Sequence, residues 1–529
     1  MKKYSSALVT KLSVIMLLPL FTYAQSPDWV ENYGKSNRYP ASFYLTGFGL
    51  AQMGKDLNLS ECKQMATDDA KSVLIQSIRV KIRSEVTSNV KVINARVSEY
   101  FSSVTQSTSS IEITGLEIEH YKSKDACYSL AFVNKEKLTS IYSKKASVLR
   151  ETIGGHLQNA MRYEDAGRKT EALNEYLLCY PLFRMLEEVQ SIVVVSRSAS
   201  ARAFSDLDKE ISSDNVNIRQ LNEAVQKLIQ RPLKTPDDLA WYLVYSINKQ
   251  LDKNDENLLV VPFSYQDTKM GSPFSRYFKE LMESKITELT DLNVVQLMTV
   301  VNPKTRNIAQ EFVAASGAAQ VMTGTYWEQP EGVKFLLIVR RVSGSQIIAS
   351  SEALISYQAL ETAKLDIKPQ NFTDALSDQK IFNKDEVIGG GFNLEVWTNK
   401  GIDNVLYTEG EHMKAYVRVN MPSYIRFIYH LADGKRTLLL DNYYIDESKV
   451  NMVYQIPEEF VCSAPFGAEF LQAFARTRRF EPLSTSDVDG YEIIDEKLKE
   501  FVPRMRGFKK LKMEVQQAEK IVVVTTLNE

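Results

Sequence analysis

The order of apolar and polar positions between residues 258 and 356 predicts a small, complete α/β unit. Residues 258–263 form a short apolar run that closes with Pro262 and Phe263, as expected of a buried strand. From residue 274 to residue 289, mostly apolar side chains recur at steps of three and four, which predicts a helix with one apolar stripe against a sheet. The other predicted elements are strands over 294–297 and 319–326, a short helix over 308–313, and strands over 333–342 and 346–356 joined by a hairpin turn.

The N-terminal region predicts an α+β domain. A strand over 43–51 is rich in aromatic residues and is interrupted by Gly47 and Gly49, where a side chain would obstruct a close neighbour. The helix that follows carries Ala66 and Ala70 on its packing face, so it can approach a sheet closely. Residues 80–92 fit either a helix or a strand, residues 111–118 alternate as a strand does, and residues 126–133 predict a strand.

Residues 144–251 predict a helical spacer. Gly167 in a turn and Ala172 at a helix contact, with apolar positions at Leu157, Ala160, Tyr163, Leu173, Tyr176 and Pro181, resemble a tetratricopeptide helix pair. Since such solenoids need about three repeats for stability and one is recognisable, we expect a spacer and not a peptide-binding groove. Thr235 followed by Pro236 and two acids predicts the start of a further helix.

The C-terminal region predicts a β-sandwich, because alternating runs recur at spacings of eight to twelve residues. A polar stretch and the run Gly389 to Gly391 precede it and predict a linker. The fold class is therefore α+β multidomain. The predicted divisions are a signal peptide (1–24), an α+β domain (25–143), the tetratricopeptide-like helical spacer (144–251), the small α/β domain (252–365), a linker (366–391) and the sandwich (392–529).

The first 24 residues have the pattern of a secretory signal. Lys2, Lys3 and Lys11 precede and border an apolar stretch, and small residues end at Ala24. The stretch is shorter than the roughly 20 residues that span a bilayer, so we expect cleavage and not anchoring. We expect no transmembrane helix in the mature chain. We expect the chain to be exported to the periplasm or to the outer-membrane periphery.

Three regions resemble known families. The α/β unit, with its Val261-Pro262-Phe263 strand, Gly317, Gly324 and the closing hairpin at Gly344, resembles the CsgG/FlgO group of periplasmic modules. Residues 27–145 resemble the lipoprotein-twenty family, to which FlgP-like flagellar outer-membrane proteins belong. The residues that carry this second likeness are Trp29, the Tyr44 to Ala51 strand, Ala66, Ala70 and the Tyr128 to Val133 strand, although the lipidated cysteine of that family is missing.

The sandwich region resembles an uncharacterised domain family of bacterial envelope proteins. The likeness lies in Glu409 to Glu411, Tyr424 to Tyr429, Asp433-Gly434, Leu440 to Tyr444, Ile456-Pro457 and Pro465 to Glu469. The final apolar run, 520–526, also fits, so the last strand should return to the sandwich. These resemblances imply an envelope-assembly protein.

Charge gives no indication of nucleic acid binding, and the cysteines include one candidate disulfide pair. The 64 basic and 66 acidic side chains nearly cancel, so no chain-wide field points to nucleic acid. Cys62 and Cys127 are candidates for a disulfide, because they fall on a helix face and on the strand that the helix could cover. The alternative is that both are small buried apolar side chains.

Two surfaces are candidate binding sites. The aromatic N-terminal segment predicts docking or self-association through Trp29, Tyr39, Phe43, Tyr44 and Phe48. A basic cluster predicts either a solvated face or a patch for anionic ligands, and its members are Arg476, Arg478, Arg479, Arg504, Arg506, Lys509, Lys510 and Lys512.

No spacing predicts a catalytic residue, a cofactor site or a metal site. We therefore expect a non-catalytic, exported scaffold or assembly factor of the Gram-negative envelope. It would contact other envelope proteins and associate peripherally with the outer membrane or with a secretion or motility machine. The alternative is a periplasmic binding module that recognises a glycan, a lipid or a partner protein through the sandwich.

Overall fold

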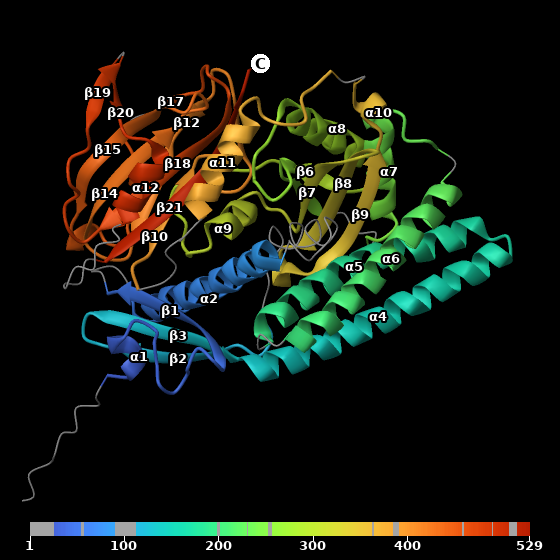
Figure 1. Ribbon diagram of the computed structural model, residues 1–529, viewed down its shortest axis with the longest axis horizontal. Helices are drawn as coiled ribbons and strands as arrows, with labels where there is room; N and C mark the ends of the chain where they lie inside the picture. The colour runs from blue at the N-terminus through green and yellow to red at the C-terminus, as the bar shows by residue number, and fades with distance from the viewer. Residues whose placement is uncertain are drawn as a thin grey trace, which may run out of the picture.

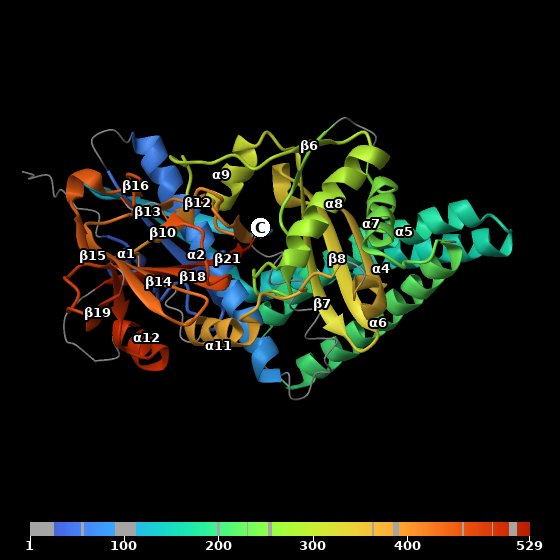
Figure 2. The same cartoon turned by 90° about the horizontal axis from the view of Figure 1, so that it is seen from above.

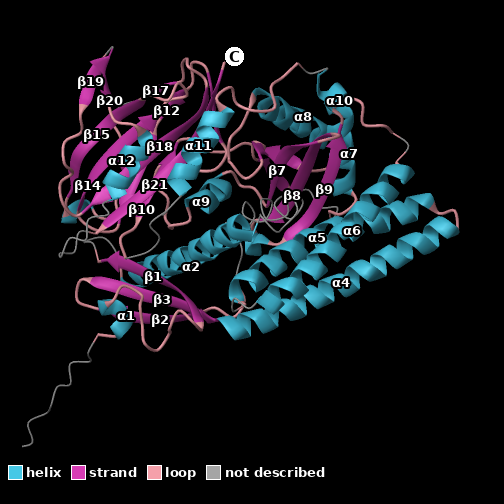
Figure 3. Ribbon diagram, viewed as in Figure 1, coloured by secondary structure: helices cyan, strands magenta, loops and turns pink. Residues whose placement is uncertain are grey.

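The computed structural model describes residues 26–53, 58–89, 113–197, 201–229, 231–251, 256–361, 364–383, 391–457, 460–488, 490–506 and 516–528. The C-terminal sandwich and the N-terminal sheet lie on one side, and the long helices lie on the other with the α/β sheet above them (Figure 3). The predicted fold class, α+β with a β-rich C-terminal region, is confirmed. Within the described ranges, no helix combines the length and the apolar content that crossing a membrane requires.

The N-terminal sheet has three antiparallel strands in the order β1 (Tyr44–Gln52), β3 (Ala126–Asn134) and β2 (Glu117–Lys122). Helix α2 (Leu59–Asn89) packs on one face, and a Cβ added to Gly47 or Gly49 would collide with the carbonyl oxygens of Ala70 and Ala66. The close approach predicted from these small residues is therefore present. Residues 80–89 are helical, and residues 90–92 lie outside the described ranges.

The spacer consists of three long helices, α4 (Lys135–Asp165), α5 (Lys169–Ser196) and α6 (Ala201–Leu228), which run from the N-terminal sheet beneath the α/β sheet (Figure 1). Gly167, with φ of 75°, forms the α4–α5 turn, and Ala172 is fully buried after it. Helix α7 (Pro236–Asn248) begins as predicted, because the Thr235 side chain accepts a 3.1 Å hydrogen bond from the Asp238 backbone N–H.

The α/β unit has a six-stranded sheet. Five strands lie in the order β6 (Asn293–Val295), β4 (Asn257–Val260), β7 (Gln320–Gln329), β8 (Gly332–Arg341) and β9 (Ile347–Ile355), and the short β5 (Ser264–Tyr265) also pairs with β7. β4 pairs in parallel with β6 and β7, and β7 to β9 form an antiparallel meander. Helix α8 (Pro273–Leu289) covers one face, where Phe274 and Phe278 pack on Phe335. Gly324 lies flat against the Phe263 ring, which leaves no room for a Cβ.

The C-terminal region is a sandwich of two main sheets. The larger has the order β11 (Val405–Thr408), β21 (Gln517–Leu527), β18 (Gly467–Arg476), β14 (Ser423–His430), β15 (Arg436–Ile445), β20 (Tyr491–Ile494) and β19 (Thr485–Val488). The smaller contains β10 (Leu394–Thr398), β13 (Ala415–Val419) and β16 (Tyr454–Gln455). The last strand, β21, returns between β11 and β18, as predicted from the apolar run that ends the chain.

The segment predicted as a linker, 366–391, contains a helix. Helix α11 (Phe372–Asn383) packs on the outer face of the larger sheet together with α12 (Leu498–Arg506), and Ala375 and Phe382 are buried there. Its apolar residues form two clusters, Phe372 to Leu376 and Ile381-Phe382, and the polar run between them hides the helical period in the sequence.

The modules share cores. One apolar core runs from Phe48 and Leu130 of the N-terminal sheet into the sandwich interior at Leu394 and Val417. Another runs from α2 through the spacer helices to the α/β sheet. Helix α2 crosses the boundary between the sandwich and the α/β unit when seen from above in Figure 2, and Figure 1 shows that it lies below both. The chain therefore folds back so that its first and last modules are packed together.

Candidate functional site

Most of the predicted docking aromatics are interior residues. The five are Trp29, Tyr39, Phe43, Tyr44 and Phe48. Trp29, Tyr39 and Phe48 are only 2%, 6% and 3% exposed, Tyr44 is half-buried, and Phe43 is exposed. Trp29 Nε1 and the Tyr39 hydroxyl both donate to the Glu119 carboxylate, at 3.2 and 2.6 Å. The structure corrects the docking prediction, because these rings cover the sheet face opposite α2.

The basic cluster is divided among different environments. Its described members are Arg476, Arg478, Arg479, Arg504 and Arg506, whereas Lys509, Lys510 and Lys512 lie outside the described residues. Arg506 is a buried structural residue: it contacts Glu519 at 2.7 Å and donates to the Phe382 carbonyl at 2.6 Å. Arg504 pairs with Glu496 at 2.7 Å. The structure therefore corrects the prediction of one continuous anionic-ligand patch and leaves Arg478 and Arg479 exposed.

The two candidate cysteines form a disulfide. Cys62 on α2 and Cys127 on β3 are bonded, with their Cα atoms 5.9 Å apart. The bond crosslinks the helix to the sheet on which it packs. Cys179 and Cys462 are buried free thiols, and burial raises the pKa of Cys179 to about 12 and that of Cys462 to about 11. Both thiols therefore stay protonated near neutral pH.

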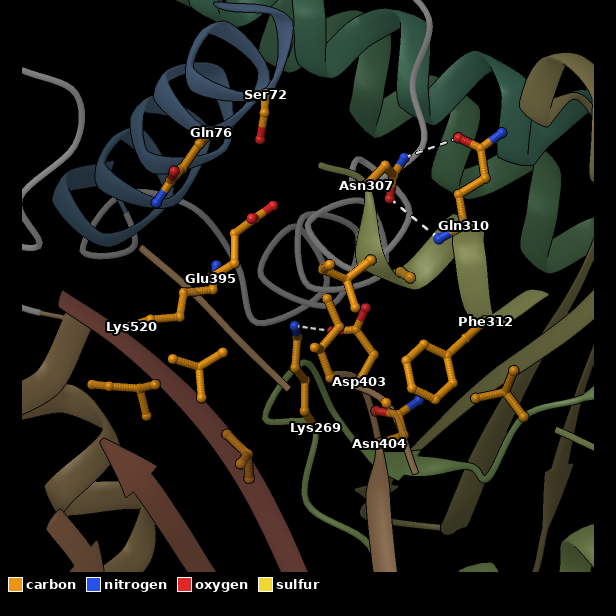
Figure 4. Close-up of a pocket in the computed structure, with 18 of the residues that line it drawn as sticks. Ser72, Gln76, Lys269, Asn307, Gln310, Phe312, Glu395, Asp403, Asn404 and Lys520 are labelled. Carbon is orange, nitrogen blue, oxygen red and sulfur yellow. Dashed lines mark hydrogen bonds and ion pairs between the residues drawn. The ribbon is translucent and has the colours of Figure 1, made fainter. Parts of the chain in front are cut away.

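A cavity of about 1600 Å³ lies where the modules meet. The α/β sheet contributes an apolar floor that includes Val261, Val321 and Ile338. Figure 4 shows the mostly polar wall, with side chains from α2, from α9 (Ile308–Ala315) and the residue before it, from the loop before α8 and from the sandwich. The wall residues labelled there are Ser72, Gln76, Lys269, Asn307, Gln310, Phe312, Glu395, Asp403, Asn404 and Lys520. Because its lining comes from modules distant in sequence, the shape of the cavity depends on how those modules are packed together.

An ion pair joins the α/β unit to the sandwich beside this cavity. Lys269 contacts the Asp403 carboxylate, and the neighbouring Asn404 side chain donates to the Pro262 carbonyl at 3.1 Å. Burial disfavours a charged Asp403, but Lys269, with Arg79 and Lys520 nearby, outweighs burial and lowers the pKa of Asp403. The carboxylate therefore stays charged, and the pair holds the two modules together.

The main polar contact among the modules is a buried set of four ionisable side chains, here called the junction network: Asp69, Arg306, Glu395 and Arg418. Asp69 comes from α2, Arg306 from the loop before α9, and the other two from β10 and β13. Arg306 contacts Asp69 at 3.3 Å and Glu395 at 2.8 Å, and Arg418 contacts Glu395 at 2.6 Å. All four side chains are at most 8% exposed.

Neutral partners complete the junction network. Arg418 donates to the Pro303 and Thr305 carbonyls at 2.7 and 2.6 Å, which holds the loop before α9 against the sandwich. Asn393 donates to Asp69 Oδ1 at 2.7 Å. Burial raises the pKa of Asp69, whereas the adjacent Arg306 works in the opposite direction. Since an uncompensated buried charge is costly, the network requires all of its members together.

A second buried network joins the spacer to the α/β sheet. Arg184 of α5 contacts Glu187 at 2.6 Å and Glu352 of β9 at 3.0 Å. Burial disfavours a charged Glu352, but Lys334 and Arg184 outweigh burial and lower the pKa of Glu352. These contacts fix the direction of the helical arm relative to the sheet.

No group of three or more His, Cys, Asp and Glu side chains within the described ranges is placed to hold a metal ion. His430 is buried and hydrogen-bonded to Gln472 at 2.8 Å, and burial lowers its pKa to about 3. It is therefore neutral and occupies a packed position on the outer face of the larger sheet.

Comparison with known proteins gives one family match. Residues 406–479 match the family described as a domain of unknown function, DUF4384. This range runs from β11 to just beyond β18, and the resemblance of the sandwich to an uncharacterised domain family is confirmed over it. The family match does not extend to the regions that resemble the lipoprotein-twenty and CsgG/FlgO families, so both resemblances stay predictions. No curated protein matches the chain.

Three solved structures are similar to parts of the chain. The LpoB C-terminal domain from Salmonella enterica is 15% identical, with 22% of this chain and 95% of that chain covered and a TM-score of 0.18. The LpoB C-terminal domain from Escherichia coli is 16% identical, with 22% and 98% covered and a TM-score of 0.17. TolB from Acinetobacter baumannii is 11% identical, with 44% and 62% covered and a TM-score of 0.14. All three TM-scores are low, and the function proposed below does not depend on them.

Sequence reasoning missed the junction network. Its members are scattered along the chain, so no local motif contains two of them. A signal was nevertheless present in the strands 394–398 and 415–419, which are entirely buried and carry one charge each, Glu395 and Arg418. Opposite charges on two such strands predict a buried cross-strand pair.

Proposed function

We propose that this chain is a non-catalytic, exported scaffold or assembly factor of the Gram-negative cell envelope. It associates with the outer membrane, or with a secretion or motility machine, through protein–protein contacts. The observation that carries the proposal is the junction network, because a scaffold must hold its modules in one fixed arrangement. Arg306 contributes most to this, since it contacts carboxylates from α2 and from the sandwich at once.

The arrangement favours rigidity over domain motion. Interfaces between independently moving domains are small and rich in exposed polar contacts. Here the N-terminal sheet and the sandwich share an apolar core, and the Asn420 side chain donates to the Leu50 carbonyl at 3.0 Å within it. The Gly271 N–H also donates to Thr525 Oγ1 at 2.9 Å, which ties the α/β unit to the last strand. A body of this kind can present surfaces at fixed distances to several partners.

Two further observations support export. The first 24 residues have the charge and hydropathy pattern of a secretory signal. The disulfide between Cys62 and Cys127 favours an oxidising compartment, because disulfides are rare in the reducing cytosol. Together they favour the periplasm as the place where the chain folds.

The test is cell fractionation of a Gram-negative host that expresses the full chain, followed by crosslinking and mass spectrometry. We expect sedimentation with the outer membrane and crosslinks to itself or to envelope proteins. Recovery as a free periplasmic monomer without crosslinks would overturn the proposal.

A pair of variants tests the role of the junction network. Arg418→Gln should reduce the crosslinked fraction several-fold, because it loosens the sandwich from the other modules. Lys137→Gln removes an exposed pair with Glu117 and should leave crosslinking unchanged. Equal crosslinking by both variants would show that a fixed arrangement of modules is not what the partners recognise.

A further inference from the structure

Four side chains form a row across one end of the larger sandwich sheet. Tyr444, Tyr424, Arg476 and Gln517 are directly opposed in register on β15, β14, β18 and β21. These four strands lie side by side in Figure 1. Directly opposed residues of antiparallel strands point to the same face. At the usual strand spacing the row is about 14 Å long. We call it the aromatic–arginine row.

The row is aromatic at one end and polar at the other. The Tyr424 and Tyr444 ring centroids are 4.7 Å apart, and Tyr444 is 47% exposed. At the polar end, Arg476 Nε donates to Gln517 Oε1 at 3.2 Å. The exposed Tyr444 ring and the Arg476 guanidinium lie on either side of Tyr424, so the row offers a flat apolar surface and a fixed charge to the same ligand.

The loop that follows β18 adds two more cations. Arg478 and Arg479 are exposed, and neither forms an ion pair with a residue that the structure describes. The Arg479 guanidinium lies 5.5 Å from the centroid of the Tyr424 ring. Two acidic side chains lie nearby: Glu481, which is exposed on the same loop, and Asp441, which pairs with Arg426 at 2.6 Å. They face four arginines, at positions 426, 476, 478 and 479. The local balance is therefore positive.

Two side chains hold this loop in place. Asn442, with φ of 52°, exchanges two hydrogen bonds with the Phe480 backbone, at 3.2 and 2.7 Å. Arg426, whose side chain is 1% exposed, donates to the Glu481 carbonyl at 2.8 Å, and its guanidinium lies 4.7 Å from the centroid of the Phe480 ring. The two exposed arginines are thus attached to a fixed loop, which reduces the entropy lost on binding.

We propose that the aromatic–arginine row, with Arg478 and Arg479, binds an acidic glycan. The apolar face of a sugar ring would stack on Tyr444 and Tyr424, and carboxylate groups along the glycan would pair with the guanidinium forks of Arg476, Arg478 and Arg479. A lipid tail would require an enclosed apolar groove, whereas Tyr444 at the aromatic end of the row is exposed and the other end is polar. The inference goes beyond the scaffold function and does not depend on it.

The test is calorimetric titration of the purified full-length protein with an oligogalacturonate. A neutral maltooligosaccharide and inorganic polyphosphate serve as comparison ligands. We expect binding of the oligogalacturonate, about tenfold weaker binding of polyphosphate and none of the neutral sugar. No binding of the oligogalacturonate, or equal binding of polyphosphate, would overturn the proposal, because the second result would indicate recognition of charge alone.

Variants separate stacking from charge. Tyr444→Ala and Arg479→Gln should each weaken oligogalacturonate binding about tenfold, and Tyr444→Phe, which keeps the ring, should retain it. The matched controls are Tyr491→Ala, an exposed tyrosine on β20, and Arg504→Gln, an exposed arginine that pairs with Glu496. Unchanged affinity in Tyr444→Ala, in a protein that melts at the same temperature as the wild type, would contradict the assignment. Outer-membrane association measured in the same variants distinguishes this failure from failure of the scaffold function.

Discussion

Glu395 and Arg418 face each other at paired positions of β10 and β13, with Arg418 Nε 2.6 Å from Glu395 Oε2. Their side chains are 8% and 3% exposed, so this charge pair is inside the protein. The same Glu395 carboxylate accepts from Arg306, which extends the pair from the sandwich into the α/β unit. The Glu395–Arg418 pair therefore joins two strands within the sandwich, and through Arg306 it also holds the sandwich to the α/β unit.

Removing the Arg418 side-chain charge should destabilise the protein strongly. Arg418→Gln leaves Glu395 buried with one cation fewer and frees the carbonyls of Pro303 and Thr305. We expect the free energy of unfolding to fall by about 3 kcal/mol. Urea unfolding followed by circular dichroism measures this loss.

The control for Arg418→Gln is Lys137→Gln, because Lys137 and its partner Glu117 are both more than half exposed. Its effect should stay below about 1 kcal/mol. Similar losses in the two variants would show that burial of the junction network adds nothing to its contribution.

The close contact between β1 and α2 predicts that a side chain at Gly49 would destabilise the protein. Gly49→Ala should destabilise the N-terminal module by more than about 2 kcal/mol, because the new methyl group would collide with the Ala66 carbonyl of α2. Gly154→Ala is the matched control, since Gly154 lies within α4 and has open space around its Cβ position. That variant should be neutral or stabilising by up to about 1 kcal/mol.

Thermal unfolding of both glycine variants, monitored by circular dichroism, tests the prediction. A Gly49→Ala protein as stable as the wild type would mean that α2 can move away from the sheet without cost. That result would also remove the physical reason for the small residues Ala66 and Ala70.

These contacts show how far the sequence predicts the structure. The α/β unit was predictable because its strands and helices follow local periodicity, and the β1–α2 contact was predictable because glycine and alanine recur at spacings that place them on one face. The burial of Trp29 and Phe48 was not predictable from the sequence, because it depends on the sandwich packing against the N-terminal sheet. Arg506 belongs to a basic run that is typical of a surface, yet Glu519 on β21 pairs with it inside the protein.

The disulfide should stabilise the chain by restricting its unfolded state. Cys62 and Cys127 are separated by 65 residues, and closing a loop of this length is worth about 4 kcal/mol in the chain-entropy account. A reducing agent should therefore lower the melting temperature of the wild type. It should leave a Cys62→Ser/Cys127→Ser double variant unchanged, and that variant should melt at the temperature of the reduced wild type. Insensitivity of the wild type to reductant would contradict the prediction.

The buried carboxyl group of Glu469 predicts how stability depends on pH. Burial raises the pKa of Glu469 to about 7, although it accepts hydrogen bonds from the Tyr429 hydroxyl at 2.8 Å and the Ala432 N–H at 3.1 Å. An unfolded glutamate titrates near 4.5, so between that pH and 7 the folded protein binds more protons than the unfolded chain. Stability should therefore fall as the pH rises through this window, by up to about 3 kcal/mol from this group.

Glu469→Gln isolates the contribution of that group to the pH dependence. The amide cannot ionise and has nearly the same shape, so stability should decline less between pH 5 and about pH 8 than in the wild type. Part of the decline should remain, because burial also raises the pKa of Asp69 and Glu187 to about 7. Urea unfolding midpoints measured across this range test the difference. Parallel curves for the variant and the wild type would show that Glu469 is already ionised in the folded protein at neutral pH, with its charge held by the Tyr429 and Ala432 hydrogen bonds.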